Sequence, residues 1–430
     1  MSNNRKWEFC MNLPIVDVCR DVGGVHWNGK CKSTTSPFRA SNSKTAFTID
    51  VKRNIFADWG YPTSDNKRGI VCGDPIDFVK YLYDCTSHEA VEFLWNRYHG
   101  GTVNEYQAKR KDVEKDKSKE APDLSKEKLD LAYSVFLSLS TLNDETRAYL
   151  HGRNLTDEDI TYYAFRTFPK RTIKTALNET LRGLGIRPES VPGLYIRAND
   201  KDASFRYYNA LVLPVRTVDG YIEGLQLRFF EPGEGPKYIW FSSSNCTSPE
   251  CVYDGKKPGT PIGFVDAHIR TASTLFITEG MFKAIAINKC YGCPVLSVQG
   301  VGNFAGIETI VQKAIDKYPS IKRILIAYDA DFISNVNVTA QAVRLFKTLE
   351  TFHPHLKYQY VSWDEKYGKG FDDLINNTGG WDVKNIVKTI DMQKFSDISE
   401  EILPEARQLW MEGKRSEIAT LFKGKLFENN

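Results

Sequence analysis

Acidic residues follow three apolar runs in the second half of the sequence. Glu279 follows TLFIT, Asp329 and Asp331 follow RILIAY, and Asp372 and Asp373 follow LKYQYVSW after a short glycine-containing loop. If each run is a strand of one parallel sheet, these acids meet at its carboxyl edge, where open α/β sheets form their sites. If the extended geometry continues through Asp329 and Asp331, both side chains also point the same way. Paired like charges are costly without a cation or a proton between them, so the pattern predicts a metal site.

The chemistry of such a site follows from its ligands, which are all carboxylate oxygens. Hard ions such as Mg²⁺ or Mn²⁺ suit this ligand set, whereas zinc suits it poorly. Magnesium on protein carboxylates usually meets substrate phosphates, which favours phosphoryl or nucleotidyl transfer with one or two ions. The alternative for any single acid is a helix cap or a solvated strand end.

The elements that must position these acids alternate between strand and helix from Thr274 onward. This βαβ series predicts a parallel sheet flanked by helices. Upstream, two β-runs are joined through Val218-Asp219-Gly220, a hairpin signal, and residues 129–190 are helical in pattern, with Thr156 as a helix cap. The fold class is therefore a multidomain α/β protein. The expected domains are 1–100, a charged linker at 101–128, an α+β subdomain at 129–270, the parallel sheet at 271–390 and a helical tail at 391–430.

Bulk composition narrows the possible classes of protein but does not identify one. The chain has 430 residues, 41% hydrophobic and 26% charged, with a net charge of +3 that is too small to indicate nucleic-acid binding by itself. No window approaches the roughly 18 apolar residues of a membrane span, and the start lacks a signal-peptide core. The 9 scattered cysteines fit a reducing compartment. We expect a soluble cytoplasmic protein with no membrane partner.

Residues 272–378 resemble the Toprim domain shared by bacterial-type primases, topoisomerases and some nucleases. The resemblance rests on Thr278-Glu279-Gly280, Asp329-Ala330-Asp331 and the closing acidic pair. It implies that Glu279 is the first ligand or a general acid/base, that Asp329 and Asp331 bind metal, and that Asp372 and Asp373 support it. One departure is Lys283, where primases of the bacterial replicative type usually carry Asp. Lys283 either contacts phosphate or lies on a helix face.

Residues 193–243 resemble the N-terminal half of the DnaG-type primase core. The matching pieces are Leu213-Pro214-Val215, Asp219-Gly220, the strand from Gly224 to Arg228, and Pro236-Lys237-Tyr238. The resemblance implies that Arg228 and Lys237 hold the template strand or the phosphates of the incoming nucleotide. Further candidates for nucleotide or strand binding are Tyr238, Arg206, Lys283 and Lys369. The stretch around Tyr149 and Arg153 resembles a helical segment of the family, which we interpret as core packing.

Residues 14–95 resemble the primase zinc-binding domain in layout, but the ligands are missing. Ser36 and Arg39 stand where the family has Cys and His, and Ala57-Asp58-Trp59-Gly60 stands where it has a Cys-x-x-Cys knuckle. The remaining Cys19, His26, Cys31 and Cys72 have no recognised spacing, and a tetrahedral zinc site needs four ligands. We therefore expect no zinc. The hypothesis is a degenerate, zinc-free domain held by Phe38, Phe47, Phe56 and Trp59.

Together these resemblances predict a bacterial DnaG-like DNA primase of a phage, plasmid or other mobile element, acting in the host cytoplasm. Its partners would be a single-stranded DNA template and ribonucleoside triphosphates. The tail is expected to pack back on the sheet, with docking on a replicative helicase as the alternative. Two other functions remain open: a Toprim nuclease that uses the same acids, and a non-catalytic single-strand-binding replication protein.

Overall fold

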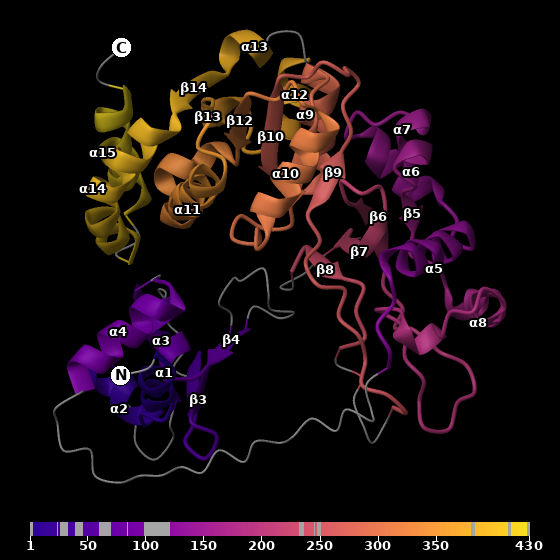
Figure 1. The fold of residues 1–430 in the computed structure, drawn as a ribbon, viewed down its shortest axis with the longest axis horizontal. Coiled ribbons are helices and arrows are strands. Elements are labelled where there is room, and N and C mark those ends of the chain that lie inside the picture. Colours follow the sequence, from indigo (N-terminus) through magenta and orange to yellow (C-terminus); the bar gives the residue numbers. More distant parts are fainter. Residues whose placement is uncertain are drawn as a thin grey trace. The chain divides into compact units, whose positions relative to one another are not determined.

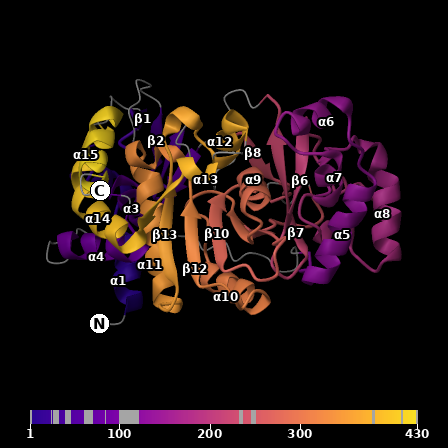
Figure 2. The ribbon, with the colours of Figure 1, turned by 90° about the horizontal axis from the view of Figure 1, so that it is seen from above.

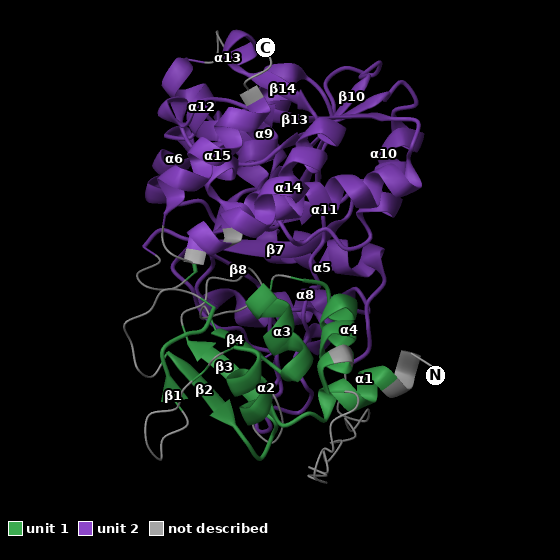
Figure 3. Cartoon of the chain, turned by 90° about the vertical axis from the view of Figure 1, so that its left-hand side faces the viewer, with its two compact units in different colours: residues 1–115, 234–236, 411–413 green, residues 116–233, 237–410, 414–430 purple. Residues whose placement is uncertain are grey.

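The computed structural model divides the chain into two compact units, coloured separately in Figure 3. The first comprises residues 1–115, 234–236 and 411–413, and the second comprises 116–233, 237–410 and 414–430. The residues that the structure describes are 3–23, 25, 33–38, 46–59, 70–83, 85–98, 121–231, 236–244, 246, 251–379, 383–411 and 414–427. His26, Cys31, Arg39, Gly60 and most of the predicted charged linker lie outside them.

The described residues of the first unit form a small antiparallel sheet and four helices. Its strands are β1 (Ser33–Thr34), β2 (Phe47–Asp50), β3 (Ile55–Trp59) and β4 (Ile70–Gly73), paired in that order. Its helices are α1 (Asn3–Met11), α2 (Ile15–Asp21), α3 (Pro75–Tyr83) and α4 (Ser87–Tyr98). Phe38, Phe47 and Phe56 pack with Phe78 at ring distances of 5.3 to 5.9 Å, as the hypothesis of an aromatic core requires. The prediction that Trp59 joins them is wrong, because 52% of Trp59 is exposed at the end of β3.

The second unit begins with four helices and a four-stranded antiparallel sheet. The helices are α5 (Lys126–Ser138), α6 (Asp144–His151), α7 (Asp157–Tyr162) and α8 (Lys174–Gly183), with short 3₁₀ turns at Arg171–Ile173 and Pro188–Ser190. The strands, in sheet order, are β5 (Arg166–Thr167), β6 (Ala210–Arg216), β7 (Ile222–Phe229) and β8 (Tyr238–Trp240). Thr156 caps α7 in a reciprocal pair with Asp159, as predicted. The predicted hairpin joins β6 to β7 through Gly220, whose φ of 89° favours glycine.

The alternating segment from Thr274 forms a six-stranded sheet, and the mixed α/β fold is confirmed. The sheet order is β14-β13-β12-β10-β11-β9, and β10 to β13 run parallel to their neighbours in that series. The two edge strands pair antiparallel. The strands are β9 (Gly263–Val265), β10 (Thr274–Glu279), β11 (Val295–Val298), β12 (Arg323–Ala327), β13 (Lys357–Ser362) and β14 (Lys388–Asp391). Figure 2 shows β10, β12 and β13 side by side.

Helices cover both faces of this sheet, because successive strand residues are apolar on both sides. Leu275 and Ile277 of β10 pack in one buried cluster, whereas Phe276 between them packs in the other. Near-continuous apolar runs are typical of strands buried on both faces. The helices and 3₁₀ turns of this part are α9 (Met281–Tyr291), α10 (Ile307–Lys317), η4 (Ala330–Ser334), α11 (Val336–Phe352), η5 (Glu365–Tyr367), α12 (Phe371–Thr378) and α13 (Val383–Ile386).

The C-terminal tail packs back on the sheet, as expected. It forms α14 (Met392–Met411) and α15 (Arg415–Phe427), which lie beside each other in Figure 1. Ile418 and Phe422 of α15 share the buried cluster of β12 and β13. No described helix, the 20-residue α14 included, has both the length and the apolarity needed to cross a membrane. The domain boundaries predicted within residues 116–430 stay predictions, since the second unit extends across all of them.

We expect Gly193→Ala to destabilise the second unit by about 3 kcal/mol, because two costs add. Gly193 has φ of 96°, and a Cβ there would lie 2.4 Å from the buried ring of Phe241. The midpoint of thermal unfolding reports the loss. Gly183→Ala is the matched control, since it ends α8 with nothing within 4 Å of its Cβ position, and its midpoint should stay or rise slightly. Equal midpoints for the two variants would contradict the prediction.

Candidate active site at the carboxyl edge of the sheet

The predicted acids meet at the point where the order of the parallel strands reverses. Strand β10 lies between β11 and β12 and is parallel to both. The chain runs from β10 to β11 on one side and from β12 to β13 on the other, so the connections from β10 and β12 leave in opposite directions and open a crevice at the carboxyl ends of these two strands. Glu279 is the last residue of β10, and Asp329 follows β12 by two residues. This is where doubly wound sheets place their ligands.

Asp329 and Asp331 converge by a different route from the one expected. The extended geometry does not continue through them: β12 ends at Ala327, and Asp331 lies in the 3₁₀ turn η4. The backbone N–H of Ala330 donates to the carbonyl of Lys369 at 2.9 Å, which ties this turn to the loop before α12. The side chain of Lys369 then reaches both carboxylates, with Nζ 2.8 Å from Asp331 Oδ2 and 3.8 Å from Asp329 Oδ2.

Lys283 lies among the acids rather than on an outward helix face. It sits in the first turn of α9, forms an ion pair with Asp329, and places Nζ 4.0 Å from Glu279 Oε2. Burial acts to lower its pKa, but the carboxylates of Glu279 and Asp329 outweigh that effect and raise it. Lys283 is therefore a permanently charged ammonium inside the acidic cluster.

Glu279 is the acid whose ionisation depends most on a nearby cation. Burial raises the pKa of its carboxyl, and the charges of Asp329 and Asp331 add to that effect. Lys283 and Lys369 oppose it without cancelling it. A further positive charge placed beside this carboxyl would favour its ionised form.

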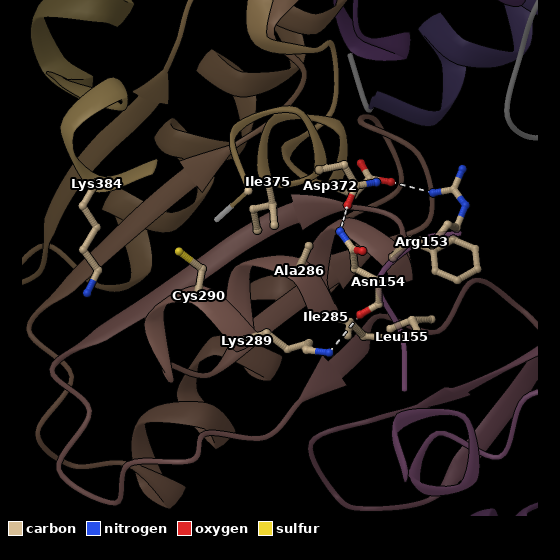
Figure 4. Close-up of a pocket in the computed structure, with 13 residues that line it drawn as sticks. Arg153, Asn154, Leu155, Ile285, Ala286, Lys289, Cys290, Asp372, Ile375 and Lys384 are labelled. Atoms are coloured by element: carbon tan, nitrogen blue, oxygen red, sulfur yellow. Dashed lines mark hydrogen bonds and ion pairs between the residues drawn. The ribbon is translucent and has the colours of Figure 1, made fainter. Parts of the chain in front are cut away.

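The third acidic pair divides into two roles. Asp372 Oδ2 accepts a hydrogen bond of 2.6 Å from Arg153 Nη1, a contact visible in Figure 4. Asp373 instead accepts the backbone N–H of Gly370 at 3.1 Å and so caps α12. The structure thus gives Asp372 a side-chain partner across the unit and gives Asp373 a local one. Metal binding by either residue stays a prediction.

Arg153 is a site residue that sequence reasoning missed. It was assigned to core packing, but its guanidinium lies 5.2 Å from the ring of Tyr149 and 4.7 Å from the ring of Phe282, and it pairs with Asp372. Arg153 lies in the turn that follows α6, within a mostly polar stretch where an arginine does not stand out. Its partner lies 219 positions away, so no spacing rule could connect them.

Arg228, Lys237 and Tyr238 form a cationic group beside Arg153. Arg228 and Tyr238 are opposite each other on β7 and β8, and the Arg228 guanidinium lies 4.2 Å from the Tyr149 ring. Arg228 is buried, yet its Nε has no hydrogen-bond partner. Burial lowers the pKa of Lys237, and the positive charges of Arg228 and Arg153 lower it further. Like charges held together in this way favour an anion between them.

Arg206, by contrast, lies on an exposed stretch before β6. Its guanidinium is 5.7 Å from the ring of Tyr208, and that ring packs against Phe229 of β7. Arg206 therefore contacts the smaller sheet through Tyr208, whose ring packs against the residue that follows Arg228. Strand binding by Arg206 stays a prediction.

The oxygen atoms of the acidic cluster differ in how far they are already occupied by partners. In the described part of the chain, no three acidic, histidine or cysteine side chains already converge as a metal group. Asp331 Oδ1 is nevertheless buried without a hydrogen-bond partner, which is unusual for a carboxylate oxygen. Asp329 already has a lysine partner that is largely buried. Glu279 and Asp331 are therefore the carboxylates with the most capacity left for an ion.

Behind Arg153 lies a cavity of about 550 Å³ between α9, α12 and the segment after α6. Leu155, Phe282 and Ile285 line it with apolar surface. Arg153 and Asp372 close one end, and Lys384 lies at the other end in Figure 4. Asp372 thus lines this cavity and also acts through its charge on Lys283 of the acidic cluster.

A comparison with protein families matches the part of the chain that carries the acids. A family profile described as a domain of unknown function, DUF3854, matches residues 266–381. The DNA primase of Thermotoga maritima is 25% identical over 390 residues, covering 87% of this chain and 60% of the relative. Over most of its own length, the chain is thus similar in sequence to this DNA primase. It spans about 60% of the length of that curated relative.

Solved primase structures show a weaker likeness. The zinc-binding and RNA polymerase domains of Aquifex aeolicus primase are 18% identical, cover 100% of both chains and give a TM-score of 0.48. The RNA polymerase domain of Mycobacterium tuberculosis primase DnaG is 17% identical, covers 70% of this chain and 99% of that domain, and gives 0.47. Both scores are below 0.5.

Proposed function

We propose that this chain is a DNA-dependent RNA primase that joins ribonucleotides on single-stranded DNA by metal-dependent nucleotidyl transfer. The observation that carries the proposal is that a group of carboxylates and a group of cations lie side by side. Carboxylates from Glu279, Asp329 and Asp331 gather at the switch point of the sheet, and the Arg153–Asp372 pair joins them to the cations of the smaller sheet. Homology to DNA primase over 87% of the chain supports the same reaction.

Each side of the site has a distinct task in this reaction. Arg228 and Lys237, with Tyr238 beside them, would hold the phosphates of the template or of the incoming triphosphate, since cations whose charge is not neutralised attract phosphate. Glu279, Asp329 and Asp331 would hold Mg²⁺ or Mn²⁺. Such an ion supplies positive charge at the reacting phosphate and at the pyrophosphate leaving group. Arg153 would keep Asp372 oriented between the two groups.

The finer assignments are part of the proposal. The parallel strands β10 to β13 and the acids at their carboxyl ends support the assignment of a Toprim domain. In residues 14–95, Ser36 and Arg39 in place of the family's Cys and His support the assignment of a degenerate domain without zinc. Stoichiometric zinc in the purified protein would overturn the latter. A mobile-element origin and a cytoplasmic location complete the proposal, with docking on a replicative helicase as the alternative role of the tail. A cellular replisome as the source would contradict the origin.

The test is primer synthesis by the full chain on single-stranded DNA with labelled ribonucleotides and Mg²⁺ or Mn²⁺. We expect short labelled products that ribonuclease degrades and that chelation by EDTA prevents. Metal-dependent shortening of the DNA without labelled product would instead identify a nuclease. Strand binding with neither activity would identify a non-catalytic replication protein, and both results would contradict the proposal.

A further inference from the structure

Neighbouring residues fix the position of the Lys283 side chain within the acidic cluster. Only 19% of its side chain is exposed, and its ammonium pairs with Asp329 and approaches Glu279 to 4.0 Å. Gly370 leaves room for the lysine stem: a Cβ at that position would lie 2.9 Å from Lys283 Cε and 2.5 Å from Asp372 Oδ1. The ammonium is therefore held in place by two carboxylates and by close packing of its stem.

Lys369 also contacts the acids, but it is held differently. More than half of its side chain, 53%, is exposed, and it reaches the cluster from the loop before α12. A long exposed side chain can leave its partner at little cost, because exposed ion pairs contribute little stability. Lys369 is thus the cation that an arriving ion can displace, whereas Lys283 is not.

The charge that remains sets how many divalent ions the cluster can neutralise. Asp372 adds no net charge, because Arg153 pairs with it at 2.6 Å. With Lys369 displaced, the carboxylates of Glu279, Asp329 and Asp331 and the ammonium of Lys283 therefore leave two negative charges. One divalent ion balances two charges, and a second would leave an excess of two positive charges in a largely buried site, which is strongly unfavourable. The buried, unpartnered Oδ1 of Asp331 offers one vacant ligand position of the kind a single ion needs.

We propose that Lys283 takes the place of a second catalytic metal ion, so that this site works with one divalent ion and one fixed ammonium. Lys283 then supplies a positive charge beside the reacting phosphate that needs no ion from solution. The inference rests on the proposed function only for the nature of the reaction. The number of ions bound is a property of the protein alone.

The experiment counts Mn²⁺ bound to the full chain without nucleotides, by electron paramagnetic resonance titration in physiological salt. We expect one ion per chain that is lost in Asp331→Asn. Lys283→Asp changes the local charge by two units and should bind two ions. Lys283→Met should bind the single ion about tenfold tighter or more, because a nearby positive charge is removed. Circular dichroism and the thermal midpoint confirm that each variant is folded.

Lys289→Met is the matched control, because it makes the same substitution on the same helix away from the acids. Lys289 pairs with Asp159 at 2.5 Å, so its loss should leave the count at one and the affinity within twofold. Two site ions in the wild type would overturn the proposal whatever the variants do. A folded Lys283→Asp chain that binds only one ion would also overturn it. A wild type that binds one ion but makes no primer would refute the proposed function and leave this inference standing.

Discussion

Asp331→Asn is expected to reduce primer synthesis about a thousandfold or more, which corresponds to ~4 kcal/mol of lost transition-state stabilisation. The substitution keeps the shape of the side chain and removes one negative oxygen. That side chain carries the buried Oδ1 without a partner, and its other oxygen accepts from Lys369 at 2.8 Å. An amide is a poor ligand for a hard cation compared with a carboxylate. Initial rates of ribonucleotide incorporation at saturating Mg²⁺ measure the loss.

The fold should survive this change, which separates a catalytic effect from a structural one. The lost ion pair involves a half-exposed lysine and contributes less than about 1 kcal/mol. Removing a charge beside Asp329 and Glu279 also relieves repulsion. Asp364→Asn is the matched control: this exposed acid follows β13 and caps η5, and its variant should keep activity within twofold. An Asp331→Asn chain that retains a tenth of wild-type activity would exclude a role for Asp331 in holding metal.

Local pattern was sufficient to predict the sheet and the edge at which its acids meet. Leu325 and Ile326 lie in a short apolar run bounded by Arg323 and Asp329, and such runs alternating with helices predict parallel strands. Parallel strands bring their carboxyl ends together whatever the spacing in sequence. Glu279, Asp329 and Asp331 could therefore be assigned to one edge without knowledge of a single contact.

Contacts that depend on the exact end of an element could not be predicted in this way. The 3₁₀ turn at Asp331 is held by a distant loop, because the Ala330 N–H donates to the carbonyl of Lys369. The pairing of Arg153 with Asp372 likewise joins segments 219 positions apart. The position of Lys283 depends on the room that Gly370 leaves. Each of these is a tertiary contact, for which composition and periodicity carry no signal.

Arg228→Met should lower primer synthesis about a hundredfold while leaving the protein at least as stable as the wild type. The buried Arg228 has an Nε without a hydrogen-bond partner. After burial, its charge and that of Arg153 lower the pKa of Lys237, so the charge of Arg228 is not neutralised. Replacing an unneutralised buried charge by an apolar side chain of similar volume is often neutral or stabilising. The lost contact with the Tyr149 ring offsets part of that gain, by about 1 kcal/mol.

Two measurements distinguish phosphate binding from a structural role for Arg228. The salt dependence of single-stranded DNA binding should flatten by about one unit of slope if a phosphate contact is lost. The thermal midpoint should stay or rise. Arg216→Met is the matched control at the other end of the same hairpin, where the arginine pairs with Asp130 at 3.7 Å, and it should change neither the slope nor the rate by more than twofold. An Arg228→Met chain that melts well below the wild type but binds DNA with an unchanged slope would show that Arg228 serves the fold, because a cation that only packs between Tyr149 and Tyr238 has no phosphate to release.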